Sequence, residues 1–266
     1  MGRASAGLAS PQIQVPQVRS IGRESLTTQV YDELRAGLME GRFWPGYRFK
    51  IRDLAVAMNV SETPCREALM QLVRERVLDM DAGRSICAAP LTLAQYLELR
   101  AIRLKLEGMA GEAAARNITP VQLREIQDLH KALIKAQDDH DWPAAVRVNW
   151  QFHHAVYAAA RMPELLALIE GIWLRNGPML NLQYPDAAPT YDGEHQHLAI
   201  IDGLKKRDPA KVRAAIKADT IEGGRKFVAL LERIDRGEAP YPQNQAEQAL
   251  PTRASGATRK VAAAKR

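Results

Sequence analysis

The chain has 266 residues, of which 46% are hydrophobic and 26% charged, a composition typical of a soluble globular protein with one large or two ordinary domains. It contains no run of about 18 apolar residues and no compact apolar segment of the secretory type near its start. We therefore expect a cytoplasmic protein with no membrane partner. The only cysteines, Cys65 and Cys87, lie outside any paired-cysteine spacing, which argues against a disulfide framework and against zinc bound through sulfur.

The formal net charge of +6 and the pI of about 9.4 suggest an anionic partner, but this charge is concentrated at the two ends of the chain. Residues 1–22 carry Arg3 and Arg19 with no acid, and residues 236–266 are also net basic. Together the two segments account for the whole net charge, so the body of the chain is formally neutral. Both lack hydrophobic periodicity, and we expect two disordered tails. The net charge of the chain therefore does not by itself indicate a nucleic-acid partner, and motifs must be considered.

Three helices and a hairpin are predicted in the first third of the chain. Apolar residues at Val30, Leu34 and Leu38 follow helical spacing and predict a helix over 26–39, which the glycines and proline of "EGRFWPGYRF" end. The segments that follow predict, in order, a short helix over 51–60, a third helix over 61–76, and two short strands around the Ala82-Gly83-Arg84 turn within 77–90.

The third helix begins in "VSETPCREAL". Ser61 is expected to cap it with its hydroxyl, and Pro64 has a backbone angle suited to a first helical turn. Leu69 and Leu72 repeat at helical spacing and predict a buried face, which leaves Arg66 on the outer face.

After Pro90 the pattern changes to long amphipathic helices with no strand pattern among them. The predicted ranges are 92–116, 119–138, 142–160, 163–176, 189–207 and 209–232. The fold class is therefore mainly α, with a winged helix-turn-helix over 23–90, including a small β-hairpin wing, and an all-α bundle over 91–235.

In a winged helix-turn-helix, the helix after the turn lies in the DNA major groove. Residues 39–90 also resemble the GntR family of bacterial transcription regulators. The shared features are Gly41, Pro45-Gly46, Arg52, Leu54-Ala55, Val60-Ser61, Thr63-Pro64, Arg66-Glu67-Ala68-Leu69 and the wing residue Gly83. The resemblance implies a regulator, not an enzyme, that binds double-stranded DNA at a specific sequence.

The polar residues of this region suit contacts with DNA. Arg52 and Arg66 can pair bidentately with guanine or with phosphate, and Ser61 and Thr63 can donate hydroxyl protons to phosphate oxygens at a helix N-terminus. Further backbone contacts are expected from Arg48, Lys50 and Arg84.

Glu62 departs from the family pattern, because the resemblance places an operator-contacting arginine at this position. An acid repels phosphates, although it can accept a hydrogen bond from cytosine N4. We therefore expect Glu62 to change the operator sequence or the affinity.

In the helical half, Asn149 and His153 lie four residues apart and so share one helix face, a spacing suited to a metal ion but more often found in hydrogen-bonded pairs. His197 and Asp219 follow apolar stripes in two other helices. His130 and His140 have no partner constellation in the sequence.

Residues 93–232 resemble the FCD effector-binding domain, found in the GntR branch that includes fatty-acid and pyruvate-type regulators. The similar stretches are "RLKLEGMAGEAAA", "NWQFHHAVY" and "HLAIIDGLKKRD" followed by "RAAIKAD". In many members an Asp and three His hold a divalent metal ion. The resemblance places those ligands at Asn149, His153, His197 and Asp219, with Asn where the acid is usual and Asp where the last His is usual.

A metal of the Zn, Ni or Mn class is therefore an expectation, with Glu194 or His195 as substitute ligands. The resemblance implies a bound effector, and the bidentate fork of Arg103 suits a small organic acid. Arg103 can bind its carboxylate, or can instead form a salt bridge with Glu107 one turn further on; both alternatives stay open.

These features favour a homodimeric regulator, with repression the preferred role, that binds a pseudo-palindromic operator and is controlled by its effector. Two alternatives are a nucleoid-type protein that binds DNA nonspecifically through its tails and, less favoured, an all-α metalloenzyme with Glu194 as base.

Overall fold

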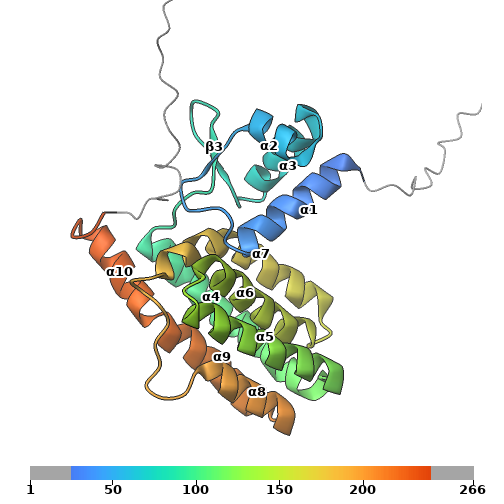
Figure 1. The fold of residues 1–266 in the computed structure, drawn as a ribbon, viewed down its shortest axis with the longest axis vertical. Coiled ribbons are helices and arrows are strands. Elements are labelled where there is room, and N and C mark those ends of the chain that lie inside the picture. Colours follow the sequence, from blue (N-terminus) through green and yellow to red (C-terminus); the bar gives the residue numbers. More distant parts are fainter. Residues whose placement is uncertain (1–24, 241–266) are drawn as a thin grey trace, which may run out of the picture.

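The computed structural model describes residues 25–240, so the expected tail over 1–22 and nearly all of that over 236–266 lie outside the described residues. Figure 1 shows a small part of helices and strands standing above a larger group of helices. Within the described range, no helix is long and apolar enough to cross a membrane.

The upper part is built from three helices and three short strands. Its elements in chain order are α1 (Leu26–Met39), β1 (Arg48–Phe49), α2 (Ile51–Met58), α3 (Glu62–Arg74), β2 (Asp79–Met80) and β3 (Ile86–Cys87). Leu34 and Leu38 from α1 meet Leu69 and Leu72 from α3 in a common core, and all four are fully buried. The predicted winged helix-turn-helix is confirmed.

The wing differs from the predicted two-stranded hairpin. The strand order is β1-β3-β2 and both pairings are antiparallel, with Arg48 opposite Cys87 and Met80 opposite Ile86. Sequence periodicity missed β1 because it has only two residues, and a tertiary contact with β3 defines it.

The start of α3 also differs in one detail. Ser61 occupies the N-cap position, but its side chain makes no capping hydrogen bond. Its hydroxyl is exposed and remains available for a hydrogen bond with another molecule. Pro64 lies buried in the first turn as predicted, and Asn59, in the left-handed conformation, ends α2.

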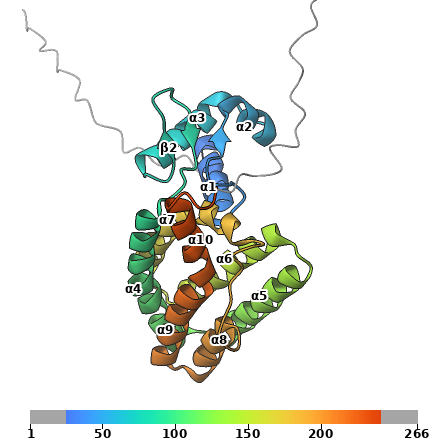
Figure 2. The ribbon, with the colours of Figure 1, turned by 90° about the vertical axis from the view of Figure 1, so that its left-hand side faces the viewer.

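Among the described residues, the lower part has only helices as its regular elements. It contains α4 (Leu93–Asn117), α5 (Pro120–Asp138), α6 (Trp142–Ala158), α7 (Pro163–Leu180), the 3-10 turn η1 (Asn181–Gln183), α8 (Gln196–Lys206), α9 (Pro209–Ala218), the π-helical turn η2 (Asp219–Gly223) and α10 (Arg225–Asp235). Figure 2 shows α4 and α9 on one side, α5 on the other, α8 at the bottom between them, and α10 in front. The predicted all-α architecture is confirmed.

Three of the predicted helix ranges were wrong: one at its start, one because of an interruption and one at its end. The helix predicted over 189–207 begins only at Gln196, since the preceding segment contains Pro189 and Gly193, which disfavour helix. The helix predicted over 209–232 is interrupted by η2, a widened π-helical turn. The helix predicted over 163–176 continues to Leu180 and takes Pro178 into its last turn.

Helix α7 connects the two parts. Leu174 belongs to the core of the upper part, although α7 is an element of the lower one. A Cβ atom at Gly177 would collide with the carbonyl oxygen of Leu38 in α1. About one helical turn after Gly177, the Asn181 side chain donates a hydrogen bond to the carbonyl oxygen of Gly41 at 2.7 Å. The close approach of α1 and α7 therefore requires glycine at position 177.

Gly177→Ala should lower the free energy of unfolding by about 1 to 3 kcal/mol, as expected for overpacking against backbone. Urea unfolding of the full chain measures the change. Gly171→Ala is the matched control, because Gly171 lies on the same helix with nothing near its missing Cβ, and alanine should stabilise the helix there by up to about 1 kcal/mol. Equal effects of the two substitutions would contradict the tight contact.

Candidate functional site

The eight side chains predicted to contact DNA are all exposed, and all belong to the upper part. Thr63 and Arg66 lie at the N-terminal end of α3, and Arg52 lies in the first turn of α2. Their neighbours Pro64 and Cys65 are buried, so packing fixes which face of α3 points outward. The remaining five are Arg48, Lys50, Ser61, Glu62 and Arg84.

Arg48 has a structural contact that the sequence did not reveal. Its guanidinium donates to Asp81 at 3.0 Å and to Ser85 at 2.7 Å, which ties β1 to the wing turn. The amide of Ser85 and the Arg48 guanidinium lower the pKa of the Asp81 carboxyl. Arg84 adopts a positive φ of 60° at the tip of this turn and carries an exposed side chain.

Glu62 lies one turn before Arg66 on α3, and their charged groups are 3.9 Å apart. Both side chains are more than half exposed, at 55% and 62% respectively, so water screens the attraction and the pair adds little to stability. The acid nevertheless lies next to the arginine that is expected to read a base.

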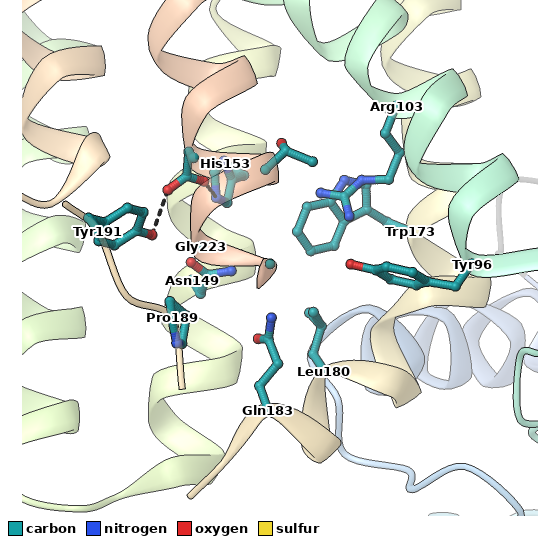
Figure 3. Close-up of a pocket in the computed structure, with 13 residues that line it drawn as sticks. Tyr96, Arg103, Asn149, His153, Trp173, Leu180, Gln183, Pro189, Tyr191 and Gly223 are labelled. Carbon is teal, nitrogen blue, oxygen red and sulfur yellow. Dashed lines mark hydrogen bonds and ion pairs between the residues drawn. The ribbon is translucent and has the colours of Figure 1, made fainter. Parts of the chain in front are cut away.

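A pocket opens in the lower part, between α4, α6, α7, η2 and the segment before α8 (Figure 3). Its lining residues are Tyr96, Arg103, Asn149, His153, Trp173, Leu180, Gln183, Pro189, Tyr191, Asp219, Thr220, Gly223 and Gly224. The pocket thus brings together Arg103 and three of the four predicted metal ligands.

The fourth predicted ligand, His197, lies beside Asp219. Its Nε2 is 3.8 Å from one carboxylate oxygen of Asp219, while Nε2 of His153 is 3.3 Å from the other. Ligand atoms of His153, His197 and Asp219 all lie within 4.8 Å of one another. Asn149 lines the same pocket one turn before His153 (Figure 3). The structure therefore gathers the predicted ligands from three separate elements.

The protonation states suit a metal ion. Burial lowers the pKa of His197 well below its usual value, so the ring is neutral at pH 7. Burial raises the pKa of Asp219, but it is lowered overall, in part by the hydrogen bonds that the carboxylate accepts from His153 and Tyr191, and the carboxyl stays ionised. Neutral imidazoles and a carboxylate are the forms that bind divalent ions.

Arg103 and Glu107 form the buried salt bridge that was one of the two alternatives for Arg103. Nε of Arg103 lies 2.6 Å from Oε1 of Glu107, and the guanidinium also stacks on Trp173, 4.4 Å from the ring centroid. Glu107 is fully buried and further accepts hydrogen bonds from the Tyr157 hydroxyl at 2.8 Å and the Trp173 indole at 2.9 Å. Because Arg103 also lines the pocket, the salt bridge does not remove it from reach of a ligand.

A second histidine cluster was missed by the sequence analysis. His130, His195 and His197 have ligand atoms within 4.8 Å of one another, so the statement that His130 has no partner constellation was wrong. Burial lowers the pKa of His130, and burial is also the main cause that lowers the pKa of His195 to about 4. The available signal was that His130 shares the apolar stripe of α5 with Ile126 and Leu133. Glu194 belongs to neither cluster and is exposed.

The class of protein follows from two family matches. Residues 26–87 match the gntR family of bacterial regulatory proteins, and residues 98–220 match the FCD domain. The chain belongs to the GntR family, and it combines the family's helix-turn-helix domain with an FCD domain, as the resemblance implied.

Individual relatives are transcriptional regulators. The HTH-type transcriptional regulator McbR of Escherichia coli is 34% identical over 197 residues, which cover 73% of this chain and 89% of McbR. A probable D-xylose utilization operon repressor of Paenarthrobacter nicotinovorans is 25% identical, over 74% of this chain and 87% of that protein. The solved structure of E. coli McbR/YncC has a TM-score of 0.71 at 32% identity and covers 80% of this chain and 100% of that one.

Glu107→Gln should lower the free energy of unfolding by about 3 kcal/mol or more, because it leaves the buried Arg103 guanidinium without its counter-charge. The measurement is urea unfolding followed by circular dichroism. Glu112→Gln is the control: Glu112 lies on the same helix and pairs with the half-exposed Arg213 at 2.9 Å, so its loss should cost less than about 1 kcal/mol. Similar costs for the two would contradict the central role of Glu107.

Proposed function

We propose that this GntR-family regulator is a dimeric repressor that reads a pseudo-palindromic operator through α3 and releases it when a small organic acid enters the FCD pocket. The main support for DNA recognition by α3 is the outward orientation of Thr63 and Arg66 at its N-terminus, which the buried neighbours on the same turn fix. Each protomer of a symmetric dimer need read only one half-site.

Individual roles follow from position. Arg66 pairs with a guanine edge, while Ser61 and Thr63, at the start of α3, donate to a phosphate. The hydroxyl of Ser61 suits this role because it makes no cap hydrogen bond. Arg52, Lys50, Arg48 and Arg84 lie exposed on the flanking elements and add contacts to the DNA backbone.

Glu62 modifies the base preference of Arg66. At 3.9 Å it draws the Arg66 guanidinium toward itself in the free protein. In the major groove, the Glu62 carboxylate must either accept a hydrogen bond from a cytosine N4 group or give up its contact with Arg66 while the phosphates repel it. The operator should therefore have a base preference that depends on Glu62.

Arg66→Ala should cost about 1 to 3 kcal/mol of operator affinity and relax specificity at one position of each half-site. The operator is first selected from random duplexes, and binding is then measured at several salt concentrations. Arg74→Ala, an exposed arginine at the other end of α3, is the control and should leave base preference unchanged. Unchanged discrimination in Arg66→Ala, or equal binding of the unmodified protein to unrelated DNA, would contradict the groove assignment.

In the pocket, we assign a divalent ion of the Zn, Ni or Mn class to His153, His197 and Asp219, with the Asn149 amide oxygen as a weaker fourth ligand. The fit rests on His197, whose two ring nitrogens are both buried without a hydrogen-bond partner. Such nitrogens are costly unless a ligand satisfies them. The ion would supply a positive centre for the effector.

The charge balance favours an anionic effector. Arg103 and Glu107 neutralise each other, and a divalent ion next to the single carboxylate of Asp219 leaves net positive charge in the pocket. A carboxylate can approach both the ion and the guanidinium edge of Arg103, and Tyr96 and Gln183 offer further hydrogen bonds (Figure 3). A small organic acid carries such an anionic group.

His153→Ala together with His197→Ala should remove bound metal from the protein, because one ligand on each of two helices is lost. Elemental analysis of protein dialysed against excess Zn²⁺ measures the metal content per chain. His140→Ala is the control, since His140 is exposed and contacts Asp138 and Trp142 outside the pocket. Full metal content in the double variant would contradict the site.

Helix α7 offers the route from pocket to DNA. Trp173 lines the pocket and donates a hydrogen bond from its indole to Glu107. The next residue, Leu174, packs in the core of the DNA-binding part. Arg35 of α1 pairs with Glu170 of α7 at 3.1 Å. An effector that shifts α7 therefore shifts α1, and in a dimer this changes the distance between the two recognition helices.

A further inference from the structure

The second histidine cluster draws its members from three different places. His130 comes from the middle of α5, His195 from the residue before α8, and His197 from the first turn of α8. The ring centroids of His130 lie 5.3 Å from His195 and 5.6 Å from His197, and those of His195 and His197 are 4.3 Å apart. The cluster lies on the α5 side of His197, and Asp219 lies 3.8 Å from the Nε2 of that same residue.

His130 has no structural partner that explains a polar group at its position. It is only 8% exposed, and its Nδ1 is buried without a hydrogen bond. On α5 it shares the buried face with Ile126 and Leu133, where an apolar residue would avoid this cost. A buried imidazole that lacks a partner and lies within reach of two other imidazoles is a candidate metal ligand.

His197 belongs to both clusters. Its ring stacks on Phe152 with centroids 3.7 Å apart and planes at 6°, so packing fixes its orientation. Both ring nitrogens lack a hydrogen-bond partner. A neutral His197 ring has one lone-pair nitrogen and one N–H, so it ligates an ion at one position at a time, and binding at both positions at once would require it to lose that proton and bridge the ions as an imidazolate.

We propose that the pocket has a second position for a divalent first-row ion, held by the imidazoles of His130, His195 and His197. This inference extends the metal site of the proposed function and does not depend on DNA binding. Three neutral imidazoles favour Zn²⁺, Co²⁺, Ni²⁺ or Cu²⁺ over Mg²⁺ or Ca²⁺, which prefer oxygen ligands. The position uses neither Asn149 nor Asp219, the two residues that depart from the family's ligand pattern.

His195 is the ligand that must adjust. Its Nδ1 accepts the backbone N–H of His197 at 3.2 Å, which places the proton of the neutral ring on Nε2. Binding of an ion therefore breaks this contact or moves that proton. Because the contact lies at the start of α8, occupation of the second position changes how the segment before α8, which carries Tyr191, is held.

The test uses Co²⁺ as a spectroscopic probe of the full chain stripped of metal by a chelator. The background variant is His153→Ala, Asp219→Asn, which removes the ligands that only the first position, the site of His153, His197 and Asp219, would use. In this background, one Co²⁺ per chain should still bind and give a visible d–d spectrum. Adding His130→Leu should weaken that binding by about 100-fold or more, since even outer-shell partners of a metal site are worth about 10- to 100-fold. Adding His140→Leu instead is the matched control and should change nothing.

Folding is checked by circular dichroism, and His153→Gln alone replaces the double background if the latter does not fold. Absence of Co²⁺ binding in the folded background, or binding indifferent to His130→Leu, would overturn the second position. If His130→Leu in the otherwise unmodified chain removes all metal, the inference stands and the first position is wrong. Operator binding, measured on the same samples, reports separately on the proposed function.

Discussion

The fully buried carboxylate of Glu107 is the constraint around which the helical domain is arranged. A buried charge is tolerated only when it is paired and hydrogen-bonded, and Glu107 obtains its partners from three helices. Arg103 comes from its own helix α4, Tyr157 from α6 and Trp173 from α7. The helices must therefore keep their relative positions for all three donors to reach it, and the wall of the pocket is fixed by the same bonds.

That constraint reaches the DNA-binding domain through α7. Trp173 bonds the buried carboxylate, while Leu174 and Gly177 on the same helix contact the N-terminal domain. Tyr157 extends the network toward the pocket, because its hydroxyl lies 3.3 Å from Nδ1 of His153. A ligand that perturbs His153 thus acts on a rigid, hydrogen-bonded frame, and a rigid frame transmits a small displacement better than loosely packed side chains do.

The chemistry of the pocket region comes from the imidazoles of the two histidine clusters and from a single ionised carboxylate, that of Asp219. Burial keeps His195 and His197 neutral, and hydrogen bonds from Tyr191 and His153 help to keep Asp219 charged. Moving the one acid from its usual position to Asp219 preserves the charge of the family's ligand set while changing the helix that carries it. In the proposed site, such a set would retain affinity for borderline metal ions and would leave a bound ion positive enough to attract an anion.

The sequence by itself determined most of the helices, the order of the two parts and the outward face of α3, because hydrophobic periodicity and helix-start residues act locally. It also determined the four candidate ligands through family resemblance. Only the tertiary structure decided that Arg103 pairs with Glu107, that η2 interrupts the last helix, and that His130 meets His195 and His197. These features depend on contacts between residues far apart in the chain, and no local pattern records such distances.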